Sequence, residues 1–249
     1  MVEANAPLWG AEAEVCRTYF GSSRRSRRSD LRWIARQAAK ELLDGVAPRA
    51  DLVARLLAEG AGATQADLLV RAAEELHEEA THFSAFAIAY DRLREKDTPA
   101  LDADTLAGAV SWPENMALRA ARQRHRSEHG ALGEHASAFT EGGYCTLYAE
   151  GMRLAGRGDA DDAIAEACTL VYEDEFGHML AWVGELGEAE LEAAEWELLT
   201  QLTVEQSRLR VLMRAAQFDD PVEPDRLAQL VAGQGPPIAF DWTRAGLAP

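Results

Sequence analysis

The chain has 249 residues, of which 25 are basic and 42 acidic, so its formal net charge is −17. Apolar residues make up 47% of it, which supports a large packed core and excludes a disordered chain. The acidic balance argues against a nucleic-acid partner, because phosphate binding needs a basic surface. No uninterrupted apolar run approaches the length of about 18 residues that crosses a bilayer, so we expect no membrane association.

The three cysteines, Cys16, Cys145 and Cys168, are widely spaced and form no Cys-x-x-Cys pair. This pattern predicts a reducing compartment and no disulfide framework. The first residues lack a basic segment followed by an apolar run, so we expect no signal peptide. The expected location is therefore the cytoplasm.

Ala, Leu, Glu and Arg dominate the sequence and β-branched runs are absent, which favours helix almost throughout. Near the N-terminus, residues 11–20 can form a short helix. The basic stretch at 21–30 is either a solvated connector or a docking site for an acidic partner or an anion. Ser29 and Asp30 can cap the helix that follows.

The longer helices are expected in two pairs followed by a fifth helix. Pro48 either kinks the first helix or starts a second segment, and a turn is expected at 60–64. Gly130 or Gly133 can interrupt the third helix, which begins at a capping box over 111–114. The expected ranges are 30–59, 65–95, 113–154, 161–186 and 188–217.

Two antiparallel helix pairs joined by a long connection at 97–112 describe an all-α, ferritin-like four-helix bundle with a long crossover. We expect a single domain over residues 1–249. Its parts would be a bundle core at 30–186, an extra helix at 187–217 and a proline-containing tail at 218–249. An α-solenoid is disfavoured because the apolar residues show no repeat of that kind.

Two copies of Glu-x-x-His stand out among the polar residues. The first is Glu79 with His82, and the second is Glu175 with His178. At a spacing of three residues both side chains of a copy share one helix face, so they can bind the same metal ion. A single Glu-x-x-His on a helix surface commonly occurs by chance. Two copies on apolar helix faces are not explained in that way.

A lone glutamate precedes each motif at a similar distance. Glu41 lies 38 residues before Glu79, and Glu141 lies 34 residues before Glu175. Each expected hairpin turn lies midway, so paired residues would stand at the same height. The six side chains then form one layer of four carboxylates and two imidazoles, enough for two divalent metal ions.

Two assignments in this set have competitors. Asp44 is the alternative to Glu41, because a kink at Pro48 would change which residue of this helix faces the interior. Glu150 is the alternative to Glu141, although it is nine residues further on and about half a turn out of phase. Four glutamates buried without a metal would be costly, which argues against a purely structural role.

This pattern resembles the ferritin-like diiron-carboxylate superfamily, whose signature is one Glu and one Glu-x-x-His from each of two helix pairs. The resemblance covers roughly residues 30–186 and rests on motif spacing. It implies that Glu79 and Glu175 bridge the metals, that His82 and His178 are terminal ligands, and that Glu41 and Glu141 complete the set.

The resemblance also implies supporting acids. The family often has an acid just before each motif glutamate, reaching across to the opposite histidine. Those positions are Glu78 and Asp174, so we expect Asp174 to pair with His82 and Glu78 with His178. An exposed acid on a helix flank is the alternative at both positions.

Departures from the family patterns narrow the function. Phe86 stands where the ribonucleotide reductase small subunit has its radical tyrosine, and Val171 stands where arylamine N-oxygenases have an extra histidine ligand. Cys145 stands where the multicomponent hydroxylases have a threonine involved in oxygen activation. The first two departures argue against the corresponding branches, although not against N-oxidation in general, whereas Cys145 either takes part in the chemistry or simply packs.

Further residues are candidates for the chemistry around the metals. Cys145 and Tyr172 are candidate catalytic residues, with ordinary packing as the alternative for both. Phe83, Phe86 and Tyr144 are candidate pocket residues. Gly142 and Gly143 follow Glu141 directly and could leave room for substrate, allow a π-bulge or permit a close helix contact.

The resemblance implies two iron ions, or manganese at one position. It also implies an O2-activating oxidase or oxygenase that acts on a small organic substrate by hydroxylation, desaturation, N-oxygenation or oxidative cleavage, for instance in bacterial specialised metabolism. Expected partners are O2, the substrate, an electron-transfer protein and a second copy of the chain. The alternatives are a ferritin-like or rubrerythrin-like protein, a metal-free helical binding protein and, against the charge, an enzyme oxidising a modified tRNA base.

Overall fold

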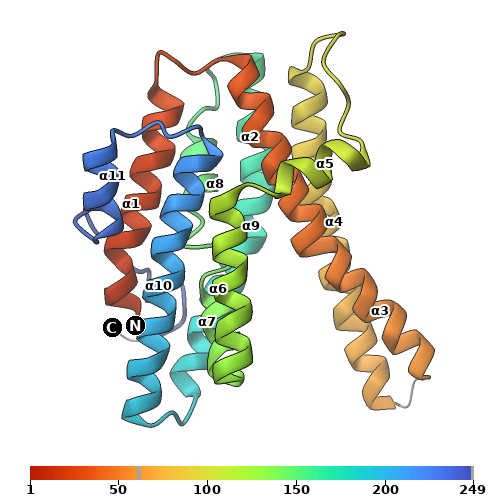
Figure 1. Cartoon of the computed structure of the whole chain (residues 1–249). Helices are drawn as coiled ribbons and strands as arrows, with labels where there is room; N and C mark the ends of the chain where they lie inside the picture. The colour runs from red at the N-terminus through yellow and green to blue at the C-terminus, as the bar shows by residue number, and fades with distance from the viewer. Residues whose placement is uncertain (61–62, 248–249) are drawn as a thin grey trace. The chain divides into compact units, whose positions relative to one another are not determined.

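The computed structural model describes residues 1–60 and 63–247, and this part of the chain is helical without any strand (Figure 1). The all-α class is therefore confirmed. None of the described helices combines the length and apolarity that a bilayer crossing requires. The helices fall into two compact units, whose boundaries differ from those of the predicted 30–186 core. Unit 1 comprises residues 1–25, 112–154 and 172–249, and unit 2 comprises 26–111 and 155–171.

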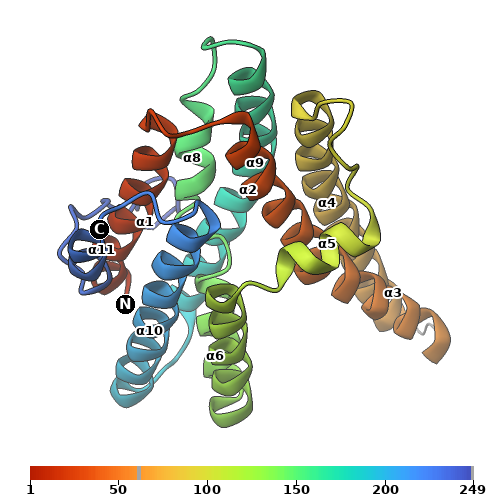
Figure 2. The same ribbon diagram turned by 45° about the horizontal axis from the view of Figure 1, so that its top comes forward.

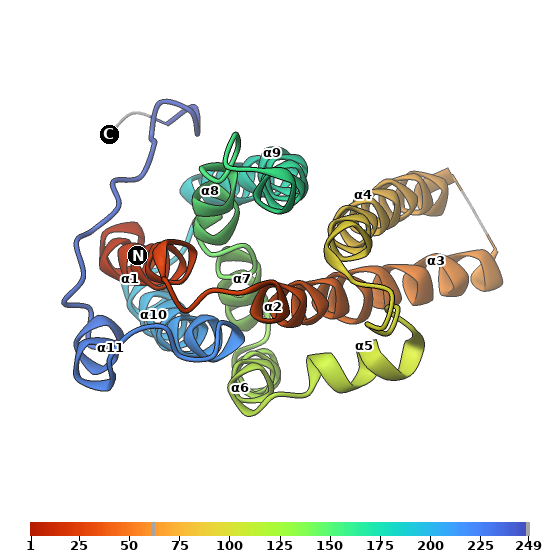
Figure 3. The ribbon, with the colours of Figure 1, turned by 90° about the horizontal axis from the view of Figure 1, so that it is seen from above.

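Unit 2 is built on α2 and α4, which pack against each other, with α3 beside α4 and α5 beside α2 (Figure 3). Ser26 caps α2 in a reciprocal pair with Ser29, three residues earlier than the predicted start. Inside the unit, the Trp33 ring meets the Phe86 ring edge-on at 6.1 Å. Its elements are α2 (Arg27–Lys40), the π-helix η1 (Glu41–Val46), α3 (Ala47–Glu59), α4 (Ala63–Leu93), α5 (Ala103–Val110) and the start of α9 (Asp159–Glu188).

The π-helix η1 links α2 to α3 without a break in the helical path. The Ala47 N–H bonds the Leu42 carbonyl, five residues back instead of four. Pro48 has no N–H and its ring crowds the carbonyl four residues earlier, so an ordinary α-turn is disfavoured there. The predicted kink or restart at Pro48 is thus a wider helical turn. The turn predicted at 60–64 includes residues 61 and 62, which lie outside the described residues.

Unit 1 is centred on α1, which packs along α10 and α8 (Figure 2). The short helix predicted at 11–20 is a helix of 20 residues that begins at Val2. Asn5, in its first turns, donates to the Thr203 hydroxyl at 3.0 Å and accepts from the Ser207 hydroxyl at 2.7 Å. The elements of unit 1 are α1 (Val2–Gly21), α6 (Pro113–His129), α7 (Ala131–Phe139), α8 (Thr146–Met152), α10 (Ala193–Gln217), α11 (Pro224–Val231) and the remainder of α9.

The long helix predicted at 113–154 is three helices, α6, α7 and α8. The interruption predicted at Gly130 occurs, with a left-handed φ of 52°. A second interruption, which the sequence analysis did not predict, is the turn at 140–145, where Gly143 and Cys145 also have positive φ. The expected position of Glu141 within a helix is therefore wrong, because this residue lies exposed in that turn.

Candidate metal centre

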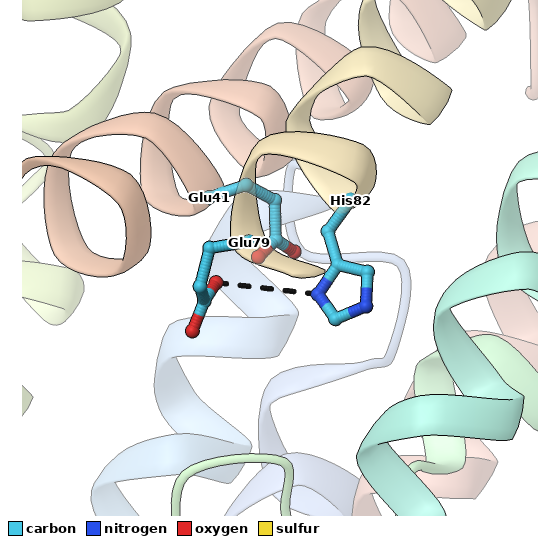
Figure 4. Close-up of side chains that lie close together, drawn as sticks. All are labelled: Glu41, Glu79 and His82. Carbon is cyan, nitrogen blue, oxygen red and sulfur yellow. Dashed lines mark ion pairs between the residues drawn. The ribbon is translucent and has the colours of Figure 1, made fainter. Parts of the chain in front are cut away.

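Three of the predicted metal ligands meet inside unit 2 (Figure 4). Glu41 comes from η1, while Glu79 and His82 come from one turn of α4, and the three side chains converge. Each offers one ligand atom, and these atoms all lie within 4.8 Å of one another. Nδ1 of His82 is 4.0 Å from Oε2 of Glu79. The structure thus brings together the first Glu-x-x-His motif and the glutamate predicted to accompany it.

Burial distinguishes this group from a surface cluster of acids. Glu41 is 7% exposed, the Glu79 side chain 14% and His82 1%. Two carboxylates at this depth lose hydration and repel each other, so the group gains stability from a cation placed between them.

The wide turn of η1 makes space for the Glu79 carboxylate. Gly45 lies in this turn, and a β-carbon at that position would be 2.1 Å from Oε2 of Glu79. A side chain at residue 45 would therefore displace the carboxylate. π-Turns inside helices are frequent at functional sites, and this one both carries Glu41 and accommodates Glu79.

Neighbouring polar groups orient the two carboxylates. The Gln37 amide, one turn before Glu41 on α2, donates to Oε1 of Glu41 at 2.6 Å. Arg49, near the start of α3, places Nη2 3.5 Å from Oε1 of Glu79 and Nε 3.7 Å from Glu75. These contacts fix carboxylate orientation, as the partners of metal ligands commonly do.

The donor set fits a first-row divalent metal. Two carboxylates and one imidazole provide oxygen and nitrogen ligands without thiolate, a mixture that suits Fe²⁺ or Mn²⁺. Within the described residues, Glu41, Glu79 and His82 are the one group of three such ligand atoms close enough to share an ion. Asp44, the alternative to Glu41, is half-buried in η1 and is not a member of this group.

The second predicted set lies in unit 1, and its three members are not a group whose ligand atoms could share an ion among the described residues. Glu175 is half-buried on α9, whereas His178 on the same helix and Glu141 in the 140–145 turn are exposed. Oε2 of Glu175 would lie 3.2 Å from a β-carbon at Gly142, so its carboxylate is beside the turn that carries Glu141.

Glu150, the alternative to Glu141, has another role. It is buried at 6% exposure and pairs with Arg17 at 2.7 Å and with Arg153 at 2.9 Å. Two arginines hold this carboxylate in place on α8, so it acts as a structural anchor between α1 and α8.

The glycine pair after Glu141 serves the turn. The helix expected at 113–154 would contain both glycines, but they lie between α7 and α8, so that expectation is wrong. Gly142 leaves room for the Glu175 carboxylate. Gly143 has φ of 55°, and a β-carbon there would be 2.2 Å from Nε of Arg210.

Cys145 ends this turn in a left-handed conformation, with φ of 51°, and is fully buried. Burial and the negative charge of Glu175 raise the pKa of its thiol. Its Sγ would be 3.4 Å from a β-carbon at Gly142, close to the Glu175 carboxylate. Cys145 thus adjoins the second ligand set, and its catalytic role stays a prediction.

The aromatic candidates in unit 1 pack against the C-terminal tail. Tyr144 stacks on Trp9 with ring centroids 4.7 Å apart, and its hydroxyl accepts from the Asp241 N–H at 2.9 Å. Tyr172 stacks on Phe176 at 5.1 Å, and burial raises its pKa. The guanidinium of Arg244 lies 4.5 Å from the centre of the Phe176 ring.

In unit 2, Phe86 is fully buried and packs in the interior, and Phe83 is half-buried. The predicted supporting acids, Glu78 and Asp174, are both half-buried. The pairs predicted for them, with His178 and His82, would each join residues of different units and stay predictions, as does the single layer of six ligands.

Several residues of the site were missed by the sequence analysis. Gln37 precedes Glu41 by one helical turn, and Arg49 follows Pro48, so local spacing could have indicated both. Arg210 bonds the Glu141 carbonyl and is itself bonded by Glu12, and no local signal in the sequence reveals these contacts.

Comparison with known proteins finds no matching family model, no matching curated protein and no matching solved structure. The resemblance to the diiron-carboxylate superfamily therefore rests on the spacing of the two motifs in the sequence and stays a prediction.

Proposed function

We propose that this chain is a non-haem diiron oxidoreductase that uses O2 to oxidise a small organic molecule. The observation that carries the proposal is the buried convergence of Glu41, Glu79 and His82 within 4.8 Å. Glu175, His178 and Glu141 are proposed to hold the second ion.

The chain's own residues would bind, orient and shield the metal. Glu41 and Glu79 supply negative charge that attracts a divalent cation, and the His82 imidazole adds a neutral ligand. Gln37 and Arg49 hold the carboxylates in orientation, and burial keeps bulk water from the ligand atoms. Ferrous iron, when bound, supplies the electrons and the open coordination positions for O2 chemistry.

Anaerobic loading with Fe²⁺, removal of unbound iron and metal analysis test this proposal. We expect two ions per chain and, after exposure to O2, consumption of O2 without further iron uptake. Continued uptake of many ions per chain would instead indicate iron storage, and a chain that retains no iron would be a metal-free helical protein. Either result would overturn the proposal.

A protein with one metal ion is the second candidate. The observation that favours it is the difference between the sets, since Glu141 and His178 are exposed whereas the first set is buried. It predicts one ion per chain, lost in a His82→Ala variant and unaffected by His178→Ala. The same metal analysis separates it from the diiron proposal.

A further inference from the structure

The two oxygens of the Glu79 carboxylate have different surroundings. Oε2 lies 4.0 Å from Nδ1 of His82 and borders Gly45, where a β-carbon would be 2.1 Å away. Oε1 lies 3.5 Å from Nη2 of Arg49. In Figure 4 the dashed line joins one Glu79 oxygen to His82, and the other oxygen points away from that ring. Glu79 therefore faces another proposed ligand with one oxygen and a guanidinium with the other.

Arg49 contacts the ligand set in a different way from Gln37. The Gln37 amide donates to Oε1 of Glu41 at 2.6 Å, which is a hydrogen-bond length. The 3.5 Å between Arg49 and Glu79 is longer than an ordinary N–H···O bond, and the Arg49 side chain is 25% exposed. Arg49 therefore acts on Glu79 mainly through its charge, because a Coulomb interaction needs no short contact.

The charges of the ligand set explain what this guanidinium does. Glu41 and Glu79 are mostly buried and bring two negative charges into one group. Carboxylates so placed repel each other, and a nearby cation offsets that repulsion. In the metal-free protein, Arg49 supplies such a cation from within unit 2.

A second anion is also within reach of the guanidinium. Nε of Arg49 is 3.7 Å from Oε2 of Glu75, which precedes Glu79 by one helical turn on α4 and is 54% exposed. Arg49 thus shares its charge between a buried proposed ligand and a surface carboxylate. When a metal ion neutralises Glu79, Arg49 can keep Glu75 as its partner.

We propose that Arg49 is the counter-ion of the metal-free ligand set and thereby sets how tightly Glu41, Glu79 and His82 hold a metal ion. Its guanidinium stabilises the ionised carboxylates before an ion binds, and it repels the ion that replaces it. A group that stabilises the metal-free state more than the loaded state lowers the affinity. The inference rests on the metal binding by the first ligand set in the proposed function and needs no second ion.

Arg49→Gln and Arg49→Lys test the proposal, because the first removes the charge and the second keeps it. Arg55→Gln is the matched control, since Arg55 is exposed on the same helix, α3. Titration with Mn²⁺ measures the affinity, and the loss of binding in His82→Ala assigns it to the first ligand set. We expect Arg49→Gln to bind Mn²⁺ roughly tenfold more tightly. Arg49→Lys and Arg55→Gln should bind as the original protein does.

Thermal unfolding without and with saturating Mn²⁺ separates a counter-ion from an orienting contact. If Arg49 is a counter-ion, Arg49→Gln should lower the unfolding temperature of the metal-free protein, and Mn²⁺ should reduce this loss. An orienting contact predicts the opposite, with weaker Mn²⁺ binding and the larger loss in the loaded protein. High salt should also reduce the gain in affinity, because the charge is partly exposed.

Unchanged or weaker Mn²⁺ binding in Arg49→Gln would overturn the inference, as would an equal gain in Arg55→Gln. If Arg49→Gln does not fold, Arg49→Met replaces it with the same expectation, because it keeps an unbranched stem without the charge. Failure of the diiron proposal is distinguishable, since it would show as one ion per chain in the unmodified protein while the Arg49 variants still decide the inference. An unmodified protein that binds no Mn²⁺ would refute both.

Discussion

Gly45 and Glu79 are sterically linked across η1 and α4: a β-carbon on Gly45 would lie 2.7 Å from the carboxylate carbon of Glu79. The absence of a side chain at one residue thus determines where the other can place its oxygens. This link affects the metal centre, because a side chain at residue 45 would displace the Glu79 carboxylate oxygens, which are proposed ligand atoms.

The first prediction is that Gly45→Ala weakens binding of the first metal ion by roughly 10–100-fold. The Glu79 carboxylate ends a flexible side chain and can swing away, so the metal-free protein should lose little stability. Alanine also favours helix over glycine by about 1 kcal/mol. Metal titration and thermal unfolding without metal measure the two effects separately.

Gly108→Ala is the control for this variant, because Gly108 is helical, belongs to unit 2 and would place its β-carbon in open space. It should bind metal normally. Equal metal affinity in Gly45→Ala and Gly108→Ala would contradict the proposed role of Gly45.

The second prediction concerns the two histidines. His82→Ala should remove the ion of the first set, and His178→Ala the ion of the second, because each variant loses one imidazole ligand. Metal analysis of protein loaded anaerobically with Fe²⁺ measures both. Full retention of two ions in both variants would refute the ligand assignment, and retention in His178→Ala alone would support the one-metal alternative.

The third prediction is that the thiols of the native protein react slowly. Cys16, Cys145 and Cys168 are buried, and burial raises the pKa of the Cys16 and Cys145 thiols. The reactive thiolate is therefore scarce even at pH 9. Labelling with a chromogenic disulfide at pH 8 should be slow until denaturant is added, when three thiols per chain react. One rapidly labelled thiol in the native protein would show that a cysteine is accessible.

The fourth prediction concerns the buried Glu12. Burial alone would raise its pKa, but Arg210 and Arg214 outweigh burial and the pKa is lowered. Its ionised form therefore stabilises the fold above about pH 4.5, and this contribution is lost as the pH falls through the lowered value. Glu12→Ala would leave two buried arginines without their anion and should cost about 3–5 kcal/mol.

Chemical denaturation of the original protein and of Glu12→Ala at pH 7 and at progressively lower pH measures both effects. The difference in unfolding free energy should shrink in acid. A difference that stays constant across the whole pH range would mean that ionisation of Glu12 contributes nothing to stability.

Helices with regular apolar spacing could be predicted from the sequence. The helix expected at 65–95 is α4, at 63–93, and Phe86 on its apolar face is buried as expected. The helix expected at 161–186 is α9, at 159–188. Local spacing also placed Glu79 and His82 on one face, because a helical repeat needs no information from elsewhere in the chain.

Features that depend on distant residues could not be predicted in this way. The first half of α1 contains Asn5, Pro7 and Gly10, a composition that argues against helix, and its polar side chains find their partners on α10. At Glu141, the two following glycines did indicate a special backbone. They lie in a turn in which the Glu141 carbonyl bonds Arg210, 69 residues further along the chain, and local spacing does not reveal such a partner.

The pairing of α1 with α10 sets an order for assembly during synthesis. Glu12 is made long before its two cations, which follow 198 and 202 residues later. Helices α2 to α5 are complete long before α10 leaves the ribosome, so their packing can begin early. Helix α1 must wait with its polar side chains in water, and unit 1 closes only after α10 has been made.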